Sequence, residues 1–511
     1  MSVLSKKVFL VNTNSDTYRK PEENLGLAYI KSFLDKKDIT VKYIDGFLCD
    51  LSNDEIIKEI KKEKDILLVG IAMHIDSQNY VLDIAEKIKK LKPKIKICIG
   101  GHVASFSDKE LLQNKNIDVI IRGEGESSMF ELCNALLNKK NFFKISNLSY
   151  RDRRGRIISN FCRPLIEDLD TLPFPDREYL KLSVRQGSLA HISSSRGCYA
   201  NCSFCSINSL YKLGKGAPWR ARSAKNTVDE IEMLVKKYKV RVFKFVDDSF
   251  FGAGKDWKKR PKEIAHEILK RNLNIKFRIS ARVNNIDEDT FSLLKKAGLY
   301  AISLGVESAS QNSLNLYNKG ITPKESQAAI DVLNKLNIQV LAGFIGFEPY
   351  MSFEDVKKNY LFLDKNRRCI FDIISKPLFV HANDAITRKL LKDNLIKKRS
   401  FPNYKFTFED ARVNMCHQAL SFWNEFNKDI YYKVIDPLSS PRLVRCGAET
   451  KLLELYKRLR TIDLSIYKLI IYNIEDNKSL KEIKNRLLVE KIKNSSEWVK
   501  INKEFKLIIK K

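Results

Sequence analysis

Three cysteines lie close together at positions 198, 202 and 205, whereas the other seven are dispersed along the chain. Three thiolates can hold three of the four irons of a cubane [4Fe–4S] cluster. The fourth iron then stays open to an exogenous ligand, like the open position of a catalytic metal. A zinc site would need a fourth ligand, and no second cysteine pair or histidine pair has the required spacing. Cys198, Cys202 and Cys205 therefore predict an iron–sulfur centre with one open coordination position.

Polar residues or a glycine follow four predicted strands downstream of these cysteines. They are Asp247 and Asp248 after 242–246, Ser280 and Arg282 at the end of 275–280, Glu307 after 301–306, and Gly346 after 339–345. The carboxyl ends of parallel strands carry the chemistry in α/β barrels, so we expect these side chains to face one site. A single carboxylate at such a position can equally be a helix cap, and the segment 247–249 leaves that alternative open.

The elements that must position these residues alternate between strand and helix patterns. Between 185 and 398, strands are expected at 190–194, 242–246, 275–280, 301–306, 339–345 and 371–377, separated by amphipathic helices. Six such units predict a partial (β/α)6 barrel. The region 399–511 is predicted to be mostly helical, with a basic end and no motif that indicates its role.

The first 145 residues show a second series of βα units, with strands expected at 8–11, 41–44, 66–71, 95–99 and 119–121. Continuous apolar strands that alternate with helices predict a parallel, doubly wound, flavodoxin-like sheet. Ligands of such sheets bind on the loops after the strands. Those loops contain Asn12, His74, Gly100, Gly101, His102, Gly123, Glu124 and Gly125. A predicted hairpin and a linker with Pro173 and Pro175 fill 146–184 and separate the two series.

The cysteine motif, with Phe204 before its last cysteine, resembles the defining motif of the radical S-adenosylmethionine (SAM) superfamily. The resemblance implies that the open iron binds SAM and that Phe204 lies beside the adenine. It also implies that Asp247 and Asp248 contact the SAM amino group, Ser280 and Arg282 its carboxylate or ribose, and Glu307 the ribose hydroxyls. Gly346 resembles the glycine that the superfamily places near the adenine.

The first domain resembles the cobalamin-binding domains that precede some radical SAM barrels. The resemblance rests on 21–29, 68–72, Gly100-Gly101-His102, 122–126 and the Leu-Pro-Phe-Pro linker. Cobalamin mutases ligate cobalt through the histidine of an Asp-x-His-x-x-Gly loop, but the loop after the first strand here starts at Asn12 and has no histidine. His74 stands outside that motif, either as a cobalt ligand or as an ordinary polar loop residue. The domain could also be a relic that no longer binds cobalamin.

Together the two resemblances imply a cobalamin-dependent enzyme that cleaves SAM reductively to a 5′-deoxyadenosyl radical. The expected reaction is methylation of an unactivated carbon in a small-molecule or peptide substrate. A cyclisation, rearrangement or dehydration without methyl transfer is the alternative. An electron donor such as flavodoxin or ferredoxin is the expected partner. A basic nucleic-acid-binding or sensing protein with a degenerate site is a more distant alternative, because the three cysteines are intact.

The amino-acid composition indicates which partners and which cellular compartment to expect. The 511 residues include 92 basic and 62 acidic side chains, for a net charge of +30. Such an excess is compatible with nucleic acid or another anionic partner, but the lysines spread over many helices and form no single stripe. No apolar run is long enough to span a membrane, and no signal-peptide core is present, so we expect a cytoplasmic protein without membrane contact.

The cysteine distribution predicts the iron content of the protein. Anaerobically reconstituted protein should contain about four irons per chain, because one three-cysteine site holds one cubane cluster. Alanine at any one of Cys198, Cys202 and Cys205 should abolish SAM cleavage, measured as release of 5′-deoxyadenosine. An iron content of about eight per chain would show a second cluster that uses the dispersed cysteines.

Overall fold

The computed structural model describes residues 6–16, 22–381, 384–400, 403–435, 443–444 and 448–510. It divides into two compact units that interleave along the chain. The first unit contains 1–186, 195–197 and 207–226, and the second contains 187–194, 198–206 and 227–511. The segment that carries the cysteine motif therefore passes from the first unit to the second and back.

The first unit is built on a seven-stranded sheet with the order β2-β1-β3-β4-β5-β6-β7. Its strands are β1 (Lys7–Asn12), β2 (Val41–Asp45), β3 (Ile66–Ala72), β4 (Lys96–Gly100), β5 (Val119–Ile121), β6 (Leu148–Arg151) and β7 (Ile157–Ser159). The first five strands pair in parallel, and the hairpin β6–β7 continues the sheet in antiparallel orientation. The doubly wound sheet is confirmed, and the predicted hairpin is its antiparallel edge.

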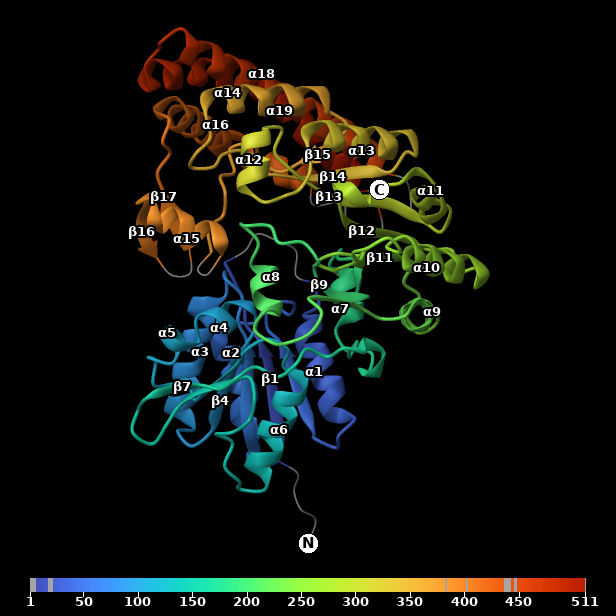
Figure 1. The fold of residues 1–511 in the computed structure, drawn as a ribbon, viewed down its shortest axis with the longest axis vertical. Coiled ribbons are helices and arrows are strands. Elements are labelled where there is room, and N and C mark those ends of the chain that lie inside the picture. The colour runs from blue at the N-terminus through green and yellow to red at the C-terminus, as the bar shows by residue number, and fades with distance from the viewer. Residues whose placement is uncertain are drawn as a thin grey trace. The chain divides into compact units, whose positions relative to one another are not determined.

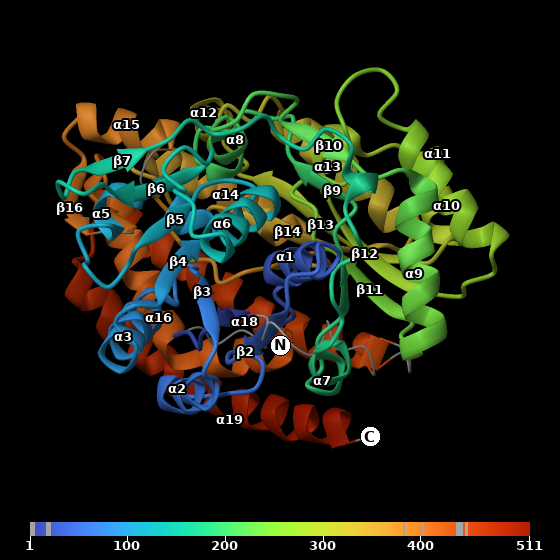
Figure 2. The same ribbon diagram turned by 90° about the horizontal axis from the view of Figure 1, so that it is seen from below.

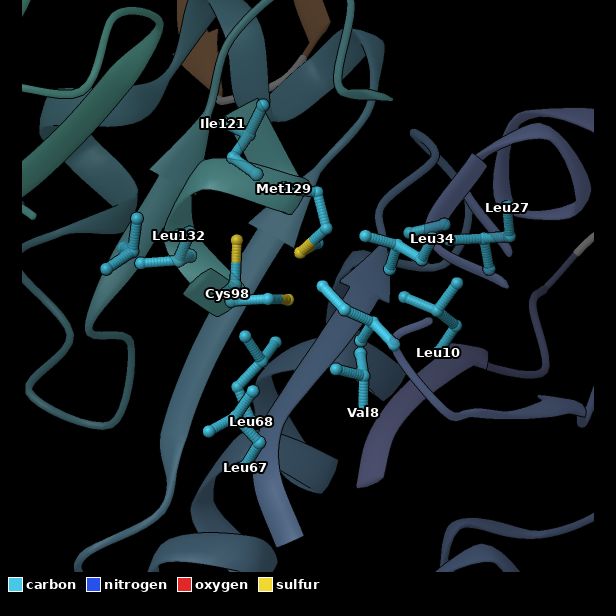
Figure 3. Close-up of a cluster of buried hydrophobic side chains, with 14 of the residues drawn as sticks. Val8, Leu10, Leu27, Leu34, Leu67, Leu68, Cys98, Ile121, Met129 and Leu132 are labelled. Atoms are coloured by element: carbon cyan, nitrogen blue, oxygen red, sulfur yellow. The ribbon is translucent and has the colours of Figure 1, made fainter. Parts of the chain in front are cut away.

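Helices cover both faces of this sheet (Figure 2). They are α1 (Leu25–Asp35), α2 (Asn53–Lys62), α3 (Gln78–Leu91), α4 (His102–Phe106), α5 (Asp108–Leu111) and α6 (Glu126–Leu137). Helices α1 and α6 pack together, as do α2 and α3. Figure 3 shows the core beneath α1 and α6, where Val8, Leu10, Leu68 and Met129 meet around Cys98. Burial raises the pKa of the Cys98 thiol, so this cysteine is a small core residue.

The second unit contains a six-stranded, fully parallel sheet with the order β15-β14-β13-β12-β11-β8. The strands are β8 (Ala190–Ile192), β11 (Val242–Phe245), β12 (Lys276–Arg282), β13 (Leu299–Glu307), β14 (Gln339–Phe344) and β15 (Ile370–Phe371). The intervening helices include α9 (Ala224–Tyr238), α10 (Lys259–Lys270), α11 (Glu288–Lys296), α12 (Gln311–Leu316), α13 (Pro323–Lys335) and α14 (Phe353–Lys365). This alternation is the predicted series of six βα units (Figure 1).

The expected sixth strand at 371–377 is wrong in its extent. The strand β15 ends at Phe371, and beyond it only Pro377 forms an isolated bridge, with Phe347. Two tyrosines bind the backbone groups of Phe371. The Tyr431 hydroxyl donates a hydrogen bond to the Phe371 carbonyl at 2.6 Å, and the Phe371 N–H donates to the Tyr456 hydroxyl at 2.8 Å. These bonds satisfy the backbone that further strand pairing would otherwise use.

Short elements and helices complete the chain. They are η1 (Leu169–Thr171), α7 (Leu180–Arg185), β9 (Ser195–Gly197), α8 (Ser206–Tyr211), β10 (Trp219–Ala221), η2 (Val283–Asn285), α15 (Ala385–Lys392), β16 (Ile396–Ser400), β17 (Asn403–Phe406), α16 (Ala411–Ile435), α18 (Glu449–Glu475) and α19 (Leu480–Lys510). The last three helices pack on one another and confirm the helical tail, drawn in orange to red in Figure 1. None of the helices in the described residues combines the length and apolarity needed to cross a bilayer.

Candidate active site

The three cysteines of the motif lie on one short loop between β9 and α8, and all three side chains are partly exposed. The loop is held at its centre by Ser203, whose N–H donates to the Tyr317 carbonyl at 2.9 Å and whose hydroxyl donates to the Leu316 carbonyl at 2.6 Å. The N–H of Ile386 donates in turn to the Ser203 carbonyl at 2.9 Å. Fixed backbone with accessible thiols is the arrangement that three cluster ligands need.

The chemistry of the donor set fits a cubane cluster. Within the residues that the structure describes, no three His, Cys, Asp or Glu side chains converge tightly enough to hold one metal ion. A cubane requires no such convergence, because each thiolate binds a different iron. The N–H of Ala200 approaches the Cys198 sulfur at 3.5 Å. Burial raises the pKa of Cys198, while this N–H and the Arg282 charge act in the opposite direction and favour the thiolate that a metal binds.

Arg282, at the carboxyl end of β12, contacts the cysteine loop directly. One terminal nitrogen donates to the Cys202 sulfur at 3.1 Å, and the other donates to the Lys319 carbonyl. The guanidinium also lies 5.8 Å from the centre of the Tyr199 ring. The structure thus brings Arg282 to the cluster cysteines, while its predicted contact with SAM stays a prediction. Ser280 precedes it by two residues, on the same face of the strand.

Glu307 ends β13 in a left-handed backbone conformation, with φ of 67°. Such a φ is costly for a residue with a side chain and is found where surrounding contacts enforce it. Lys319, buried and outside the sequence prediction, donates to Glu307 Oε1 at 2.8 Å. A side chain at Gly305 would place Cβ 2.7 Å from both of these groups, so this glycine makes room for the ion pair.

The other predicted SAM contacts have different surroundings. Asp247 is buried and accepts hydrogen bonds from the N–H and hydroxyl of Ser194, which follows β8, whereas Asp248 is exposed. No helix begins at 247–249, so the helix-cap alternative is wrong. Phe204 meets Tyr317 edge to face at 5.2 Å. A Cβ at Gly346 would lie 2.3 Å from the Ile374 carbonyl, so close chain approach already requires this glycine.

The predicted cobalamin residues follow the strands of the first sheet, as expected from the loops. Asn12 is buried at the end of β1, where its amide donates to Asp45 at 2.8 Å and its oxygen accepts from Asn24 at 3.2 Å. The Asn24 amide also lies 3.3 Å from His74 Nε2, so the His74 ring already has a polar neighbour. Asn24, the N-cap of α1, lies in the segment 21–29 that carries the resemblance, but it is not among the predicted site residues.

Gly100, Gly101 and His102 link β4 to α4, and Gly101 has φ of 111°. A Cβ on Gly101 would lie 2.7 Å from the Met73 carbonyl, so this turn requires glycine. The His102 ring meets Phe106 edge to face.

Gly123, Glu124 and Gly125 link β5 to α6. The Glu124 carboxylate accepts from Arg196 at 3.0 Å, from Arg220 at 2.9 Å and from the Ile166 N–H at 2.8 Å. Glu124 therefore belongs to an ion network with Arg196 and Arg220, which the sequence did not reveal.

Comparison with known proteins identifies both domains. A model of the B12 binding domain matches residues 13–132, and a model of the radical SAM superfamily matches residues 192–363. An uncharacterized methyltransferase of Pyrococcus horikoshii is 32% identical over 346 residues, which make up 67% of this chain and 73% of that protein. The chain belongs to the B12-binding radical SAM enzymes. Its cofactors are a [4Fe–4S] cluster, SAM and cobalamin.

Two further proteins are similar to this chain, one in sequence and one in fold. The anaerobic magnesium-protoporphyrin IX monomethyl ester cyclase of Rubrivivax gelatinosus is 31% identical over 335 residues, 62% of this chain and 58% of that protein. The structure of the cobalamin-dependent SAM radical enzyme OxsB with aqua-cobalamin superimposes with a TM-score of 0.81 at 21% identity, over 99% of this chain and 79% of OxsB. The second similarity is one of fold.

The Glu307–Lys319 pair generates a test of the predicted SAM contact. Glu307→Gln should weaken SAM binding by about tenfold or more, because an ionised acceptor of hydrogen bonds is lost. Lys319→Gln removes the other half of the same ion pair and leaves the carboxylate in place. Equilibrium dialysis of reconstituted protein measures SAM affinity, and thermal unfolding measures stability. Equal loss of stability in both variants with unchanged SAM affinity would make the pair structural.

The environment of His74 generates a second test. We expect the protein to bind cobalamin without a histidine ligand from this chain, because the loop after β1 has no histidine and His74 contacts Asn24. His74→Ala should then leave the cobalt(II) paramagnetic resonance spectrum unchanged. Nitrogen hyperfine splitting that is present in the wild type and absent from His74→Ala would instead identify His74 as the ligand.

Proposed function

We propose that this B12-binding radical SAM enzyme is a methyltransferase that acts on an unactivated carbon. The observation that carries the proposal is the 32% identity with an uncharacterized methyltransferase over 73% of that protein, in a chain whose three cluster cysteines are intact. When bound, the cofactors supply a 5′-deoxyadenosyl radical from SAM and a methyl group on cobalamin. The substrate is a small molecule or peptide, and the partner that supplies electrons is a protein such as flavodoxin or ferredoxin.

The residues of the chain hold and orient this chemistry. Ser203 fixes the cysteine loop against the segment 316–317, so the thiol positions are set before cofactors bind. Arg282 places a positive charge beside the Cys202 sulfur and offsets the negative charge of a thiolate-bound cluster. The Glu307 carboxylate, held by Lys319 at a strand end, is an acceptor suited to ribose hydroxyls.

A second candidate is a reaction without methyl transfer. The magnesium-protoporphyrin IX monomethyl ester cyclase is 31% identical, nearly the same as the methyltransferase, although the chain spans only 58% of that protein. A cyclisation or rearrangement would use the SAM-derived radical and leave no new methyl group. The chain residues that contact the cluster loop serve both reactions equally, so only the products distinguish them.

The products of SAM test the proposal. Protein reconstituted anaerobically with iron, sulfide and cobalamin is incubated with a reductant, methyl-deuterated SAM and a small-molecule extract, and the products are measured by mass spectrometry. A methyltransferase should form S-adenosylhomocysteine together with 5′-deoxyadenosine, and a deuterated methyl group should appear in one extract component. The Cys202→Ala variant is the control and should form neither labelled product nor 5′-deoxyadenosine. Turnover that yields 5′-deoxyadenosine and an altered extract component without label would contradict methyl transfer.

A further inference from the structure

Four charged side chains in the first unit, two of them buried and two partly buried, form a network at the base of the cysteine loop. Arg196 lies on β9, two residues before Cys198, and Arg220 lies on the partner strand β10. Their counter-ions, Glu124 and Glu126, lie in the loop after β5 and at the start of α6. Arg196 donates to Glu124 at 3.0 Å and to Glu126 at 2.6 Å, and Arg220 donates to Glu124 at 2.9 Å. The two arginines and two carboxylates balance in charge.

The pairing of β9 with β10 makes this network obligatory. Arg196 and Arg220 are direct cross-strand partners, and like charges in that position destabilise a ribbon. Glu124 bonds to both guanidinium groups and removes the repulsion. Each guanidinium also lies over an aromatic ring, Tyr29 for Arg196 and Tyr211 for Arg220.

The ion pair with Arg196 favours the ionised form of Glu126. Burial alone would raise the pKa of Glu126, but the charge and hydrogen bond of Arg196 outweigh burial and lower that pKa. Removal of one partner from a buried group of this kind leaves an uncompensated charge, so the four residues act as a unit.

The two-stranded ribbon of β9 and β10, which this network holds, ends one residue before the first cysteine of the motif. Gly197 adopts φ of 81°, and a Cβ there would lie 1.8 Å from the Pro218 carbonyl, so the ribbon turns tightly one residue before Cys198. The chain has no flexible spacer between Arg196 and the first cluster cysteine. Any displacement of the loop after β5 would therefore act on Arg196 and, through Gly197, on Cys198.

We propose that Arg196, Arg220, Glu124 and Glu126 are positioning residues that couple cobalamin occupancy to the iron–sulfur cluster. Cobalamin that binds on the 123–125 loop acts on Glu124, and the network transmits that effect to the root of the cysteine loop. The inference rests on the cofactors of the family and on the predicted cobalamin role of this loop, and it is independent of the reaction catalysed. Coupling between two sites is reciprocal, so cluster loading must change cobalamin affinity by the same factor as cobalamin changes cluster binding.

The test compares the cobalamin affinity of the full chain before and after cluster reconstitution, by absorbance titration with hydroxocobalamin. In the wild type the two dissociation constants should differ by about fivefold or more, the lower range of measured couplings. In Arg196→Gln the ratio should fall to about one, while both cofactors still bind. Arg163→Gln is the matched control: it breaks a bidentate Arg–Glu pair with Glu131 in the same unit, removes no member of the four-residue network, and should keep the wild-type ratio.

A second variant keeps the test decisive if Arg196→Gln does not fold. Glu124→Gln is isosteric, keeps an oxygen acceptor for the Ile166 N–H, and removes the charge that separates the two arginines. It should also reduce the ratio to about one, and if Arg196→Gln does not fold, this variant decides alone. The resonance spectrum of the reduced cluster, recorded with and without cobalamin, should differ in the wild type and not in these variants. Equal affinities in the wild type, or a wild-type ratio in the folded variants, would overturn the proposal.

Discussion

A cluster with one open iron requires three thiolates that are held in place and still reach the solvent. These two demands conflict on a short loop, because an exposed loop is normally mobile. The structure resolves the conflict through the backbone: Ser203, between the second and third cysteines, bonds to the carboxyl end of α12 and to the start of α15. The thiols stay partly exposed while the peptide that carries them is fixed. The predicted binding of SAM to an open iron of the cluster depends on this arrangement.

Charge compensation is the second constraint, and it is met in both units by pairs at strand ends. In the second unit Lys319 holds Glu307, and Arg282 lies against the Cys202 sulfur. In the first unit Glu124 and Glu126 hold the two arginines of the ribbon. Buried charges are stable only with such partners, so each pair fixes the position of the loop or strand end on which it lies. Each of these side chains is thereby held in place.

At a few positions the backbone conformation or a close approach of two chain segments restricts which residue can be present. An ideal Cβ on Gly101 or Gly197 would lie within 3 Å of a backbone carbonyl oxygen, which could not move away easily. Glu307 is the informative exception, since it takes a left-handed conformation although it carries a side chain. The ion pair with Lys319 holds its carboxylate in place.

The sequence by itself determined the two βα series, the parallel orientation of most strands and the cysteine motif. Those features are local: strand and helix periodicity, glycine positions and the spacing of three thiols are legible in a few consecutive residues. It could not determine that β15 would stop at Phe371, because tyrosines some sixty and eighty-five residues away take up its backbone groups. Nor could it show that Glu124 meets two arginines 72 and 96 residues further along the chain, or that Lys319 would pair with Glu307. Only the tertiary structure decides which charges share a low-dielectric site, because that choice depends on packing between segments that have no pattern in common.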